Sequence, residues 1–342
     1  MKSIVHDNFI KNSLKKFILF FDNINLFLQN NNLIWRWFNY IFDYSFFQEY
    51  TNVISGIFSY RNDEDNYFEY RRNIHRLEKG LISYPRKDFF ASDYIRKTVS
   101  LFITLSEKHE KTEMIKWGGE VLNLYFNCIK NYPNEIEILK NSFYKIYRTE
   151  KKSNYLPYIP SFKNLINHDQ LGDFFKNKKS VRYFNENHVS DKIIKKALNT
   201  ASLAPSGCNR QTYEYYVFNK KYKFVQEVLN FSAGTKGWGK TVHNCIVLVA
   251  KLDAFNHKNS RHAGHVDGIL SLSYFILALK SLGVESCLIN WVDNPIVEKK
   301  LLKKIKAKIN DKILITIAIG YPSENSQVAF SSRLESNYIS NL

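Results

Sequence analysis

The sequence predicts a mostly helical first part, followed by an α/β or α+β part in which helices cover a sheet. In residues 1–150, apolar side chains recur every three to four positions and no extended β-like run is present, which is the spacing of amphipathic helices. From about residue 171, helix-like and strand-like segments alternate, as they do where helices pack on a sheet. Residues 151–169 begin with four polar residues and contain two prolines, which favours a linker.

The length and composition of the chain support this division. Its 342 residues exceed one average domain. We therefore expect a helical domain of unknown role at 1–150, a linker at 151–169 and a sheet-containing domain at 170–342. Hydrophobic residues make up 44% of the chain and charged residues 24%, which is typical of proteins with a buried core.

The predicted elements follow in chain order. The clearest helical pattern of the first part is at 98–132, and we expect Gly118 and Gly119 to divide it, because glycine weakens a helix interior. In the second part, Ser190 is a candidate N-cap for a helix at 191–203, and Gly283 ends a long apolar helix at 266–282. The other predicted elements are strands at 213–218, 245–252, 286–291 and 313–319, a short helix ending near 231, and a basic amphipathic helix at 295–307.

The N-terminal segment is aromatic and apolar but does not predict a membrane-spanning helix. Polar residues before position 17 interrupt any run typical of a signal peptide. Within residues 17–42, Asp22 and the three asparagines at 30–32 leave stretches shorter than the ~20 apolar residues that a spanning helix needs. We expect this segment to pack in a core. The alternative is a peripheral contact of residues 17–42 with a membrane.

The cysteines indicate neither a zinc site nor a disulfide framework. They stand far apart and form no C-x-x-C pair: Cys128, Cys208, Cys245 and Cys287. We expect free thiols in a reducing compartment, and hence a cytoplasmic protein.

The positive charge is concentrated in the second part. The net charge is +17 overall; residues 1–150 hold 21 Lys and Arg against 18 Asp and Glu, and residues 151–342 hold 28 against 14. Such an excess attracts nucleic acids, anionic lipids or anionic small molecules. Lysine-rich runs such as 299–308 are also typical of a solvated helix face, and the sequence contains no recognised nucleic-acid motif. We expect no nucleic-acid partner.

Residues 234–241 match the spelling of a phosphate-binding loop, G-x-x-x-x-G-K-[ST]. The binding mechanism requires a strand before the loop and a helix after it, so that the helix N-terminus faces the phosphates. Here a helix is predicted before the loop and a strand after it. We do not expect an ATP site.

Two short patterns in the second part contain groups that suit a polar, anionic ligand. Residues 178–182 place three cations and a hydroxyl within five positions, which can bind phosphate but is also typical of a solvated turn. Residues 204–211 end a helix at Pro205 and place Ser206, Asn209 and Gln211 on a tight turn.

Two further patterns follow along the chain. Asp267 and Gly268 lie near the start of the apolar helix, where an aspartate alone indicates a helix cap. Residues 320–322 read Gly-Tyr-Pro and are followed by Arg333.

In this order and spacing, the four patterns resemble the nitroreductase family of FMN enzymes. The opening R-R-S-x-R of that family is similar to residues 178–182, and its A-P-S-x-x-N-x-Q turn is similar to residues 204–211. The resemblance extends through Asp267, Gly268, the Leu-Gly pair at 282–283, the Gly-Tyr-Pro of 320–322 and Arg333, and covers about residues 170–340. It implies an α+β domain with a mixed sheet covered by helices.

The resemblance also implies a role for each site residue. Lys178, Lys179 and Arg333 would hold the FMN phosphate and ribityl end, with Ser180 as a neutral donor. Arg182 would face the N1/O2 edge of the flavin, where negative charge develops on reduction. Pro205, Ser206, Asn209 and Gln211 form the turn that would contact the ring or ribityl chain, and Leu288, Ile289 and Asn290 belong to the strand that would line one ring face.

The implied reaction is a ping-pong hydride transfer from NADH or NADPH, through FMN, to an oxidised organic small molecule. It needs no side-chain acid or base, so we expect no catalytic side chain. The family usually forms homodimers with FMN at the subunit interface, and we expect a homodimer by analogy. The sequence departs from the family at Ser331, where a basic residue is common, at Thr212-Tyr213, and at 218–245, which is short for a lid over the substrate pocket.

The first part contains one distinctive string at residues 70–81. It resembles the His-Arg-Leu-Glu-Lys-Gly-Leu string found before some nitroreductase-like domains, including members associated with surface-polysaccharide metabolism. Its charged residues suit a helix-end salt-bridge cluster or, alternatively, a lid that reaches into the flavin pocket: His75, Arg76, Glu78 and Lys79.

Three other functions stay open at this point. Within flavin chemistry, the alternatives are a dehydrogenase or oxidase, a reductive dehalogenase, or an oxygen-dependent enzyme that consumes flavin. Outside it, the chain could be a flavin-free scaffold or binding protein. Nucleic-acid binding through the basic surface would instead show a steep loss of affinity with salt.

Overall fold

The structure is a computed structural model that describes residues 34, 44–108, 112–147, 155–161, 163 and 165–340. Its internal contacts divide the chain into two compact units, residues 1–52 with 293–295, and residues 53–292 with 296–342. The predicted core or membrane segment at 17–42 lies, apart from Ile34, outside the described residues. In the part that is described, no helix is both long and apolar enough to cross a bilayer.

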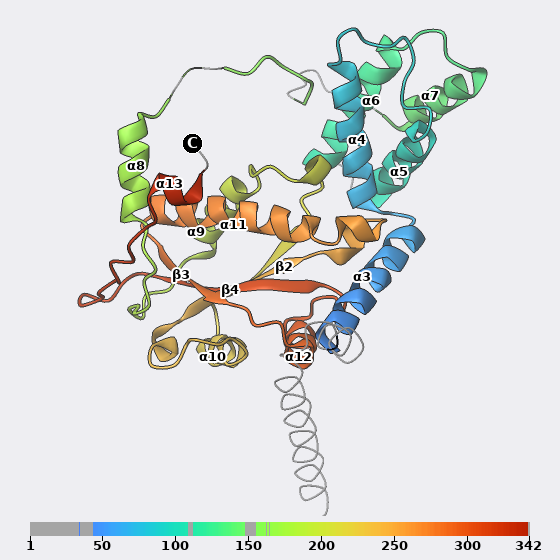
Figure 1. Ribbon diagram of the computed structural model, residues 1–342. Helices are drawn as coiled ribbons and strands as arrows, with labels where there is room; N and C mark the ends of the chain where they lie inside the picture. Colours follow the sequence, from blue (N-terminus) through green and yellow to red (C-terminus); the bar gives the residue numbers. More distant parts are fainter. Residues whose placement is uncertain are drawn as a thin grey trace, which may run out of the picture. The chain divides into compact units, whose positions relative to one another are not determined.

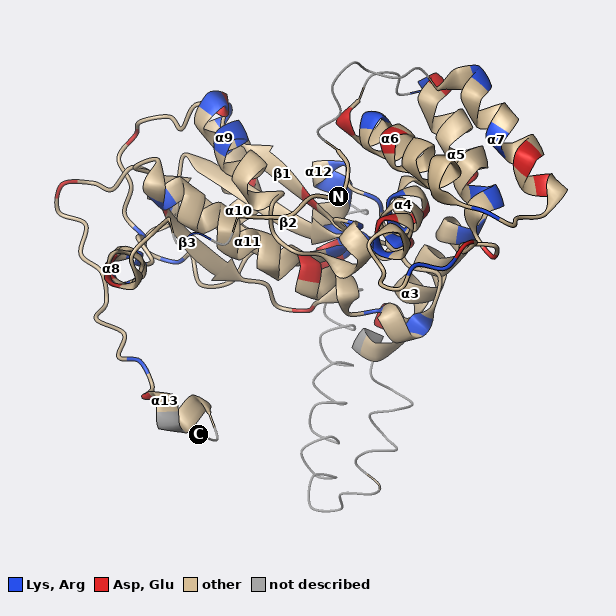
Figure 2. Cartoon of the chain, turned by 90° about the horizontal axis from the view of Figure 1, so that it is seen from above, with Lys and Arg blue, Asp and Glu red and all other residues tan. Residues whose placement is uncertain are grey.

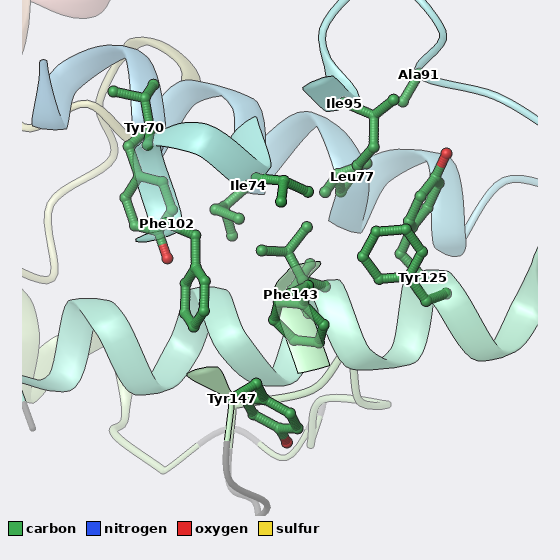
Figure 3. Packing of buried hydrophobic residues seen from close by; sticks show 14 of the residues in the cluster. Tyr70, Ile74, Leu77, Ala91, Ile95, Phe102, Tyr125, Phe143 and Tyr147 are labelled. Carbon is green, nitrogen blue, oxygen red and sulfur yellow. The ribbon is translucent and has the colours of Figure 1, made fainter. Parts of the chain in front are cut away.

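The first part of the described chain is helical, as the sequence predicts. Its helices are α3 (Tyr44–Asn62), α4 (Tyr67–Leu81), α5 (Ile95–Lys108), α6 (Glu113–Cys128) and α7 (Asn134–Ile146). Asn66 caps α4, because its side chain accepts a hydrogen bond from the Glu69 backbone N–H at 2.9 Å. Figure 3 shows the core that α4 to α7 share, in which Ile74 and Phe143 are fully buried.

The expected division of residues 98–132 into two helices is confirmed, but its predicted position is wrong. The break falls between Lys108 and Glu113, whereas Gly118 and Gly119 lie inside α6 and are buried. A Cβ atom on Gly118 would lie 1.7 Å from the Tyr70 hydroxyl. These glycines therefore mark a close helix contact and do not mark a helix end.

The second part contains a four-stranded sheet, which confirms the α+β class. Its strands are β1 (Tyr213–Phe218), β2 (Asn244–Ala250), β3 (Glu285–Asn290) and β4 (Lys312–Gly320), in the order β1-β2-β4-β3. The three strand pairs are antiparallel, and the isolated bridge between Ser180 and Ser286 is parallel.

Helices cover both faces of the sheet. The helices of this part are α8 (His168–Asn177), α9 (Asp191–Ala201), α10 (Tyr222–Leu229), α11 (Ala263–Ser281), α12 (Pro295–Ile305) and α13 (Ser336–Ile339). Alternate residues of β2 pack on opposite faces: Ile246 and Leu248 on α9 and α11, Val247 and Val249 on α10 and α12. Figure 1 shows α11 and α12 on the two sides of the sheet.

Most predicted elements of this part are present with shifted ends. Ser190 caps α9 by accepting from the Ile193 N–H, and Gly283 follows α11 with a φ of +77°. Residues 234–241 follow α10 and precede β2, the order that argued against a phosphate loop. The four cysteines are free, with Cys245 and Cys287 buried.

Candidate functional site

A pocket of about 250 Å³ lies where the chain after α8 passes β3; we call it the cationic pocket. It brings together all four predicted phosphate-end residues, Arg182 and one residue of the predicted ring-face strand. Its lining is Lys178, Lys179, Ser180, Arg182, Ile276, Leu288, Ala329, Ser331 and Arg333. The lining contains four cations and no carboxylate, so an anion would be attracted into it.

Local structure places the first cations of this pocket. Asn167 begins α8 with a capping box, and the helix ends at Asn177, directly before Lys178. The following segment runs beside β3, where the Val181 N–H donates to the Ser286 carbonyl at 3.3 Å. The Lys178 ammonium donates to the carbonyls of Lys179 at 2.8 Å and Ser286 at 3.4 Å. Lys178 therefore holds the segment to the strand and keeps a third N–H for a ligand.

The cations of the pocket differ in their burial and in the charges near them. Burial lowers the pKa of the Lys178 ammonium, while the nearby Glu285 carboxylate opposes this shift. Arg182 and Arg333 are exposed and can turn their planar donors toward an incoming phosphate. Ser331, which stands where the family often has a basic residue, lines the pocket in a left-handed conformation with a φ of +52°.

The predicted strand residues divide between the two faces of β3. Leu288 lines the cationic pocket and is 38% exposed. Ile289 is buried and packs in the core under α12, because successive strand residues point to opposite faces. Asn290 is exposed at the end of β3 and does not line the pocket.

The predicted turn forms a second cluster around the short helix η1 (Gly207–Asn209). Three of its non-glycine residues have left-handed backbones: Cys208 at φ +53°, Asn209 at +54° and Gln211 at +55°. Such conformations cost free energy and persist where their surroundings hold them. The Ser206 hydroxyl accepts from the Gln211 N–H at 3.1 Å, and the Gln211 amide donates to the Ser202 carbonyl at 2.9 Å. Pro205 is exposed beside them.

Asp267 ties this turn to α11, so the interpretation of Asp267 as a helix cap is wrong. The helix begins earlier, at Ala263, and Asp267 lies in its second turn. One carboxylate oxygen accepts from the Gly207 N–H at 2.8 Å and the other from the Thr212 hydroxyl at 2.9 Å. Burial raises the pKa of Asp267, and these hydrogen bonds oppose that shift.

Helix α4 contacts the same turn through a residue that the sequence did not single out. Arg71 donates from Nε to the Asn209 carbonyl at 2.9 Å and from Nη2 to Asn209 Oδ1 at 3.2 Å. Its guanidinium also lies 5.5 Å from the centroid of the Trp117 ring. The only sequence signal for this contact was the position of Arg71 inside the string 70–81.

Neighbouring polar side chains of that string pair with other side chains of the helical part. His75 lies 3.1 Å from Glu78, and Arg76 lies 3.1 Å from Asp93. None of these residues, nor Lys79, lines the cationic pocket. The His75–Glu78 and Arg76–Asp93 contacts agree with the salt-bridge interpretation for three of its four residues, whereas Lys79 makes no ion pair in the described part of the chain.

Within one chain, the turn and the cationic pocket lie apart. The turn is held by Asp267, whereas the pocket contains Ile276, nine residues further along α11. At 1.5 Å per helical residue, these anchor points lie about 14 Å apart along the axis. Pro205, Ser206, Asn209 and Gln211 therefore do not line the pocket that holds Lys178 and Arg182.

A larger pocket of about 420 Å³ lies beside α9 and β1, with Ile194 and Phe218 in its lining. It contains none of the predicted site residues. Within the described ranges, no group of His, Cys, Asp and Glu side chains could hold a metal ion.

The α+β fold places a cation-lined pocket beside β3, and a pocket of this charge attracts anions. Residues 175–321 match the profile described as the nitroreductase family. This span, less than half of the chain, includes every predicted site residue except Arg333.

Two curated proteins are similar to parts of the chain. An iodotyrosine deiodinase from Hydra vulgaris is 24% identical over 220 residues, which cover 55% of this chain and 79% of that protein. A CLA biosynthesis enone reductase from Lactiplantibacillus plantarum is 38% identical over 74 residues, which cover 20% of this chain and 34% of that protein.

Solved structures with a similar arrangement include two nitroreductases. An FMN-dependent nitroreductase from Clostridium difficile R20291 is 23% identical, covers 48% of this chain and 94% of its own, and has a TM-score of 0.41. A nitroreductase family protein from Streptococcus pneumoniae TIGR4 is 17% identical, covers 50% of this chain and 99% of its own, and has a TM-score of 0.43.

Proposed function

We propose that the chain is an FMN-dependent oxidoreductase of the nitroreductase type. NADH or NADPH would supply electrons in a ping-pong reaction, and an oxidised organic molecule would accept them. The observation that carries this proposal is the cationic pocket, in which Lys178, Lys179, Arg182 and Arg333 converge without a carboxylate, inside or just beyond the span that matches the family.

The donors of the pocket suit FMN. A phosphate dianion needs several cations and neutral donors, which Lys178, Lys179, Arg333 and Ser180 supply. Leu288 offers an exposed apolar side chain for one ring face. When bound, FMN supplies the hydride transfer; Arg182 would stabilise the negative charge that develops at the pyrimidine edge.

The proposal is tested by an Arg182→Ala, Asn209→Ala double variant of the full chain. We expect it to lose FMN when purified and to bind added FMN at least tenfold more weakly than the wild type, because both predicted contact regions are weakened. Flavin fluorescence titration measures this. Full retention of FMN would contradict the site, and parallel anaerobic titrations with NADH and NADPH would identify the donor.

We further propose that two copies of the chain complete the site. Helix α11 is largely apolar and has no continuous polar face, the pattern of a helix buried on most sides. Yet several of its apolar residues are 39–58% exposed: Val266, Ile269, Leu270 and Tyr274. Val266 directly precedes Asp267, and the other three lie between Asp267 and Ile276. A second copy packed on this face would cover them and could bring its turn toward the first copy's cationic pocket.

Reductive dehalogenation is a second candidate, favoured by the similarity to an iodotyrosine deiodinase over 79% of that protein. An aryl halide would be the oxidised substrate, with halide released and hydrogen taking its place. Incubation of the reduced protein with iodotyrosine and with a nitroaromatic compound separates the candidates. Iodide release favours the dehalogenase, and consumption of the nitro compound alone favours the nitroreductase.

A further inference from the structure

Arg71 holds both the backbone and the side chain of one residue in the candidate flavin turn. Its Nε–H donates to the Asn209 carbonyl and its Nη2–H to Asn209 Oδ1, at 2.9 and 3.2 Å. A guanidinium presents these donors in one rigid plane. Arg71 lies on α4, outside the residues that match the family, so the helical part of the chain supplies this contact.

The backbone of Asn209 needs such support. Its φ of +54° is left-handed, as are those of Cys208 and Gln211, and Asn tolerates this region better than most residues. Asp267 and Ser206 hold the two ends of the turn at the Gly207 N–H and the Gln211 N–H. Among the described residues, Arg71 is the hydrogen-bond partner of the Asn209 side chain.

The Arg71 contact fixes which way the Asn209 amide faces. A guanidinium carries donors and no acceptor. Asn209 Oδ1 must therefore face Arg71, because a flipped amide would place two donors against each other. The Asn209 Nδ2–H group, a donor, is then the end left for another partner.

Arg71 is suited to a fixed role of this kind. It is partly buried, and burial lowers the pKa of its guanidinium. In the described part of the chain it makes no ion pair with a carboxylate; its contacts are Asn209 and the ring of Trp117. A cation held this way loses hydration, and its hydrogen bonds to Asn209 offset part of that loss.

We propose that Arg71 is a positioning residue of the flavin site. It holds Asn209 so that the Nδ2–H is offered as a hydrogen-bond donor to the bound flavin, and through this contact α4 takes part in the site. This inference rests on the proposed function, because it requires FMN to bind at the turn.

The test compares full-length variants by FMN titration and by the visible absorption spectrum of bound flavin. We expect Arg71→Met to weaken FMN binding about tenfold or more and to shift the flavin spectrum, because charge-assisted hydrogen bonds are lost. Arg71→Lys should recover part of the affinity, since lysine keeps the charge but lacks the fork. Arg76→Met is the matched control: Arg76 lies on the same helix but pairs with Asp93 and stacks on Tyr94.

Asn209→Asp separates positioning from folding. A carboxylate keeps, and strengthens, the contact with Arg71 but has no N–H donor. We expect this variant to melt at or above the wild-type temperature and still to lose FMN affinity. It therefore also decides the question if Arg71→Met fails to fold.

The possible failures are distinguishable. A wild-type protein that binds no FMN overturns the proposed function, and the inference with it. If the wild type binds FMN, and Arg71→Met or Asn209→Asp binds it with the same affinity and the same spectrum, the inference is overturned and the proposed function stands. Arg71→Met that lowers thermal stability without a spectral shift also overturns it, because this is the result of a purely structural role.

Discussion

Asp267 lies in the second turn of α11, and its two carboxylate oxygens hold two different points of the candidate flavin turn. The Gly207 N–H and the Thr212 hydroxyl are its donors. The sequence analysis placed Asp267 in a family motif and read it alone as a helix cap; it did not give the partners, because they lie 60 and 55 positions away along the chain. Contacts between residues so far apart in the sequence depend on how α9, β1 and α11 pack.

Replacing Asp267 should therefore affect both folding and the site. Asp267→Ala leaves the Gly207 N–H and the buried Thr212 hydroxyl without their acceptor, and we expect a loss of about 2–3 kcal/mol in the free energy of unfolding. Ser273→Ala is the control, because Ser273 is exposed on the same helix. Urea unfolding measures both. A loss below about 0.5 kcal/mol for Asp267→Ala, the range of ordinary surface substitutions, would contradict the role given to this carboxylate.

Asp311 should make stability depend on pH. The Asp311 side chain is fully buried and accepts from the Lys251 ammonium at 2.6 Å. Burial raises the pKa of Asp311 to about 6, although the Lys251 charge opposes the shift. The folded chain then binds the proton more tightly than the unfolded chain. This contribution is complete below about pH 4 and is lost as pH rises through about 6.

The measurement is the free energy of unfolding of the wild type and of Asp311→Asn between pH 4 and 6.5. We expect the wild type to lose about 2 kcal/mol relative to the variant over this range. A difference between the two proteins that stays constant with pH would show that the carboxyl group titrates normally in the folded state.

At the scale of elements, α4 and α6 pack closely at a glycine. Figure 3 shows Tyr70 in the core of the helical part. Its hydroxyl is buried, has no hydrogen-bond partner among the described residues, and occupies the space next to Gly118. The sequence pattern located α6 but read Gly118 as a break, because periodicity does not reveal which neighbour fills the groove.

Two glycine substitutions in helices should therefore have opposite effects. Ala is favoured over Gly by about 1 kcal/mol in a helix interior. We expect Gly172→Ala in α8 to stabilise by about that amount, since nothing lies within 4 Å of the added Cβ. Gly118→Ala should destabilise by about 1–3 kcal/mol through overpacking.

Thermal unfolding of the two single variants tests this contrast. Adding Tyr70→Phe to Gly118→Ala should recover stability, because the substitution removes the atom that the new methyl group meets. Equal effects at positions 118 and 172 would contradict the close contact.

The sequence predicted which segments form helices and strands better than it predicted how these pack together. Residues 213–218 formed a strand with the expected bounds, and 313–319 lies within β4, because runs of β-branched and aromatic residues favour strands. Lys178, Lys179, Ser180 and Arg182 share a pocket because they are nearly consecutive. Asn209 does not reach that pocket in one chain, since α11 separates their anchor points, and Arg71 came from an element that the family pattern does not cover.

At the scale of the whole molecule, the cationic pocket accounts for only part of the positive charge of the second half. Figure 2 shows Lys and Arg on α9 and α12, helices that contribute no residue to the pocket. Exposed charges of this kind increase the rate at which anionic ligands arrive without fixing where they bind. Binding at the pocket should therefore weaken with added salt without being abolished.

The proposed two-chain site predicts complementation. One variant chain, Lys179→Ala with Arg182→Ala, lacks pocket cations; another, Asn209→Ala, lacks the turn contact. Each alone should bind FMN weakly. After co-expression about half of the dimers should be mixed, each with one intact site of two, so bound FMN should approach a quarter of the wild-type amount. The contrary result is a wild type that sediments as a dimer, together with mixed variants that recover no FMN. Both contact regions would then belong to one chain.

The absorbance spectrum of the purified full-length protein, with chromatography of any released cofactor, shows whether the chain is a flavoprotein. We expect a yellow protein that releases one FMN per chain. A colourless protein that also fails to bind added FMN would contradict the oxidoreductase proposal and favour a flavin-free binding protein.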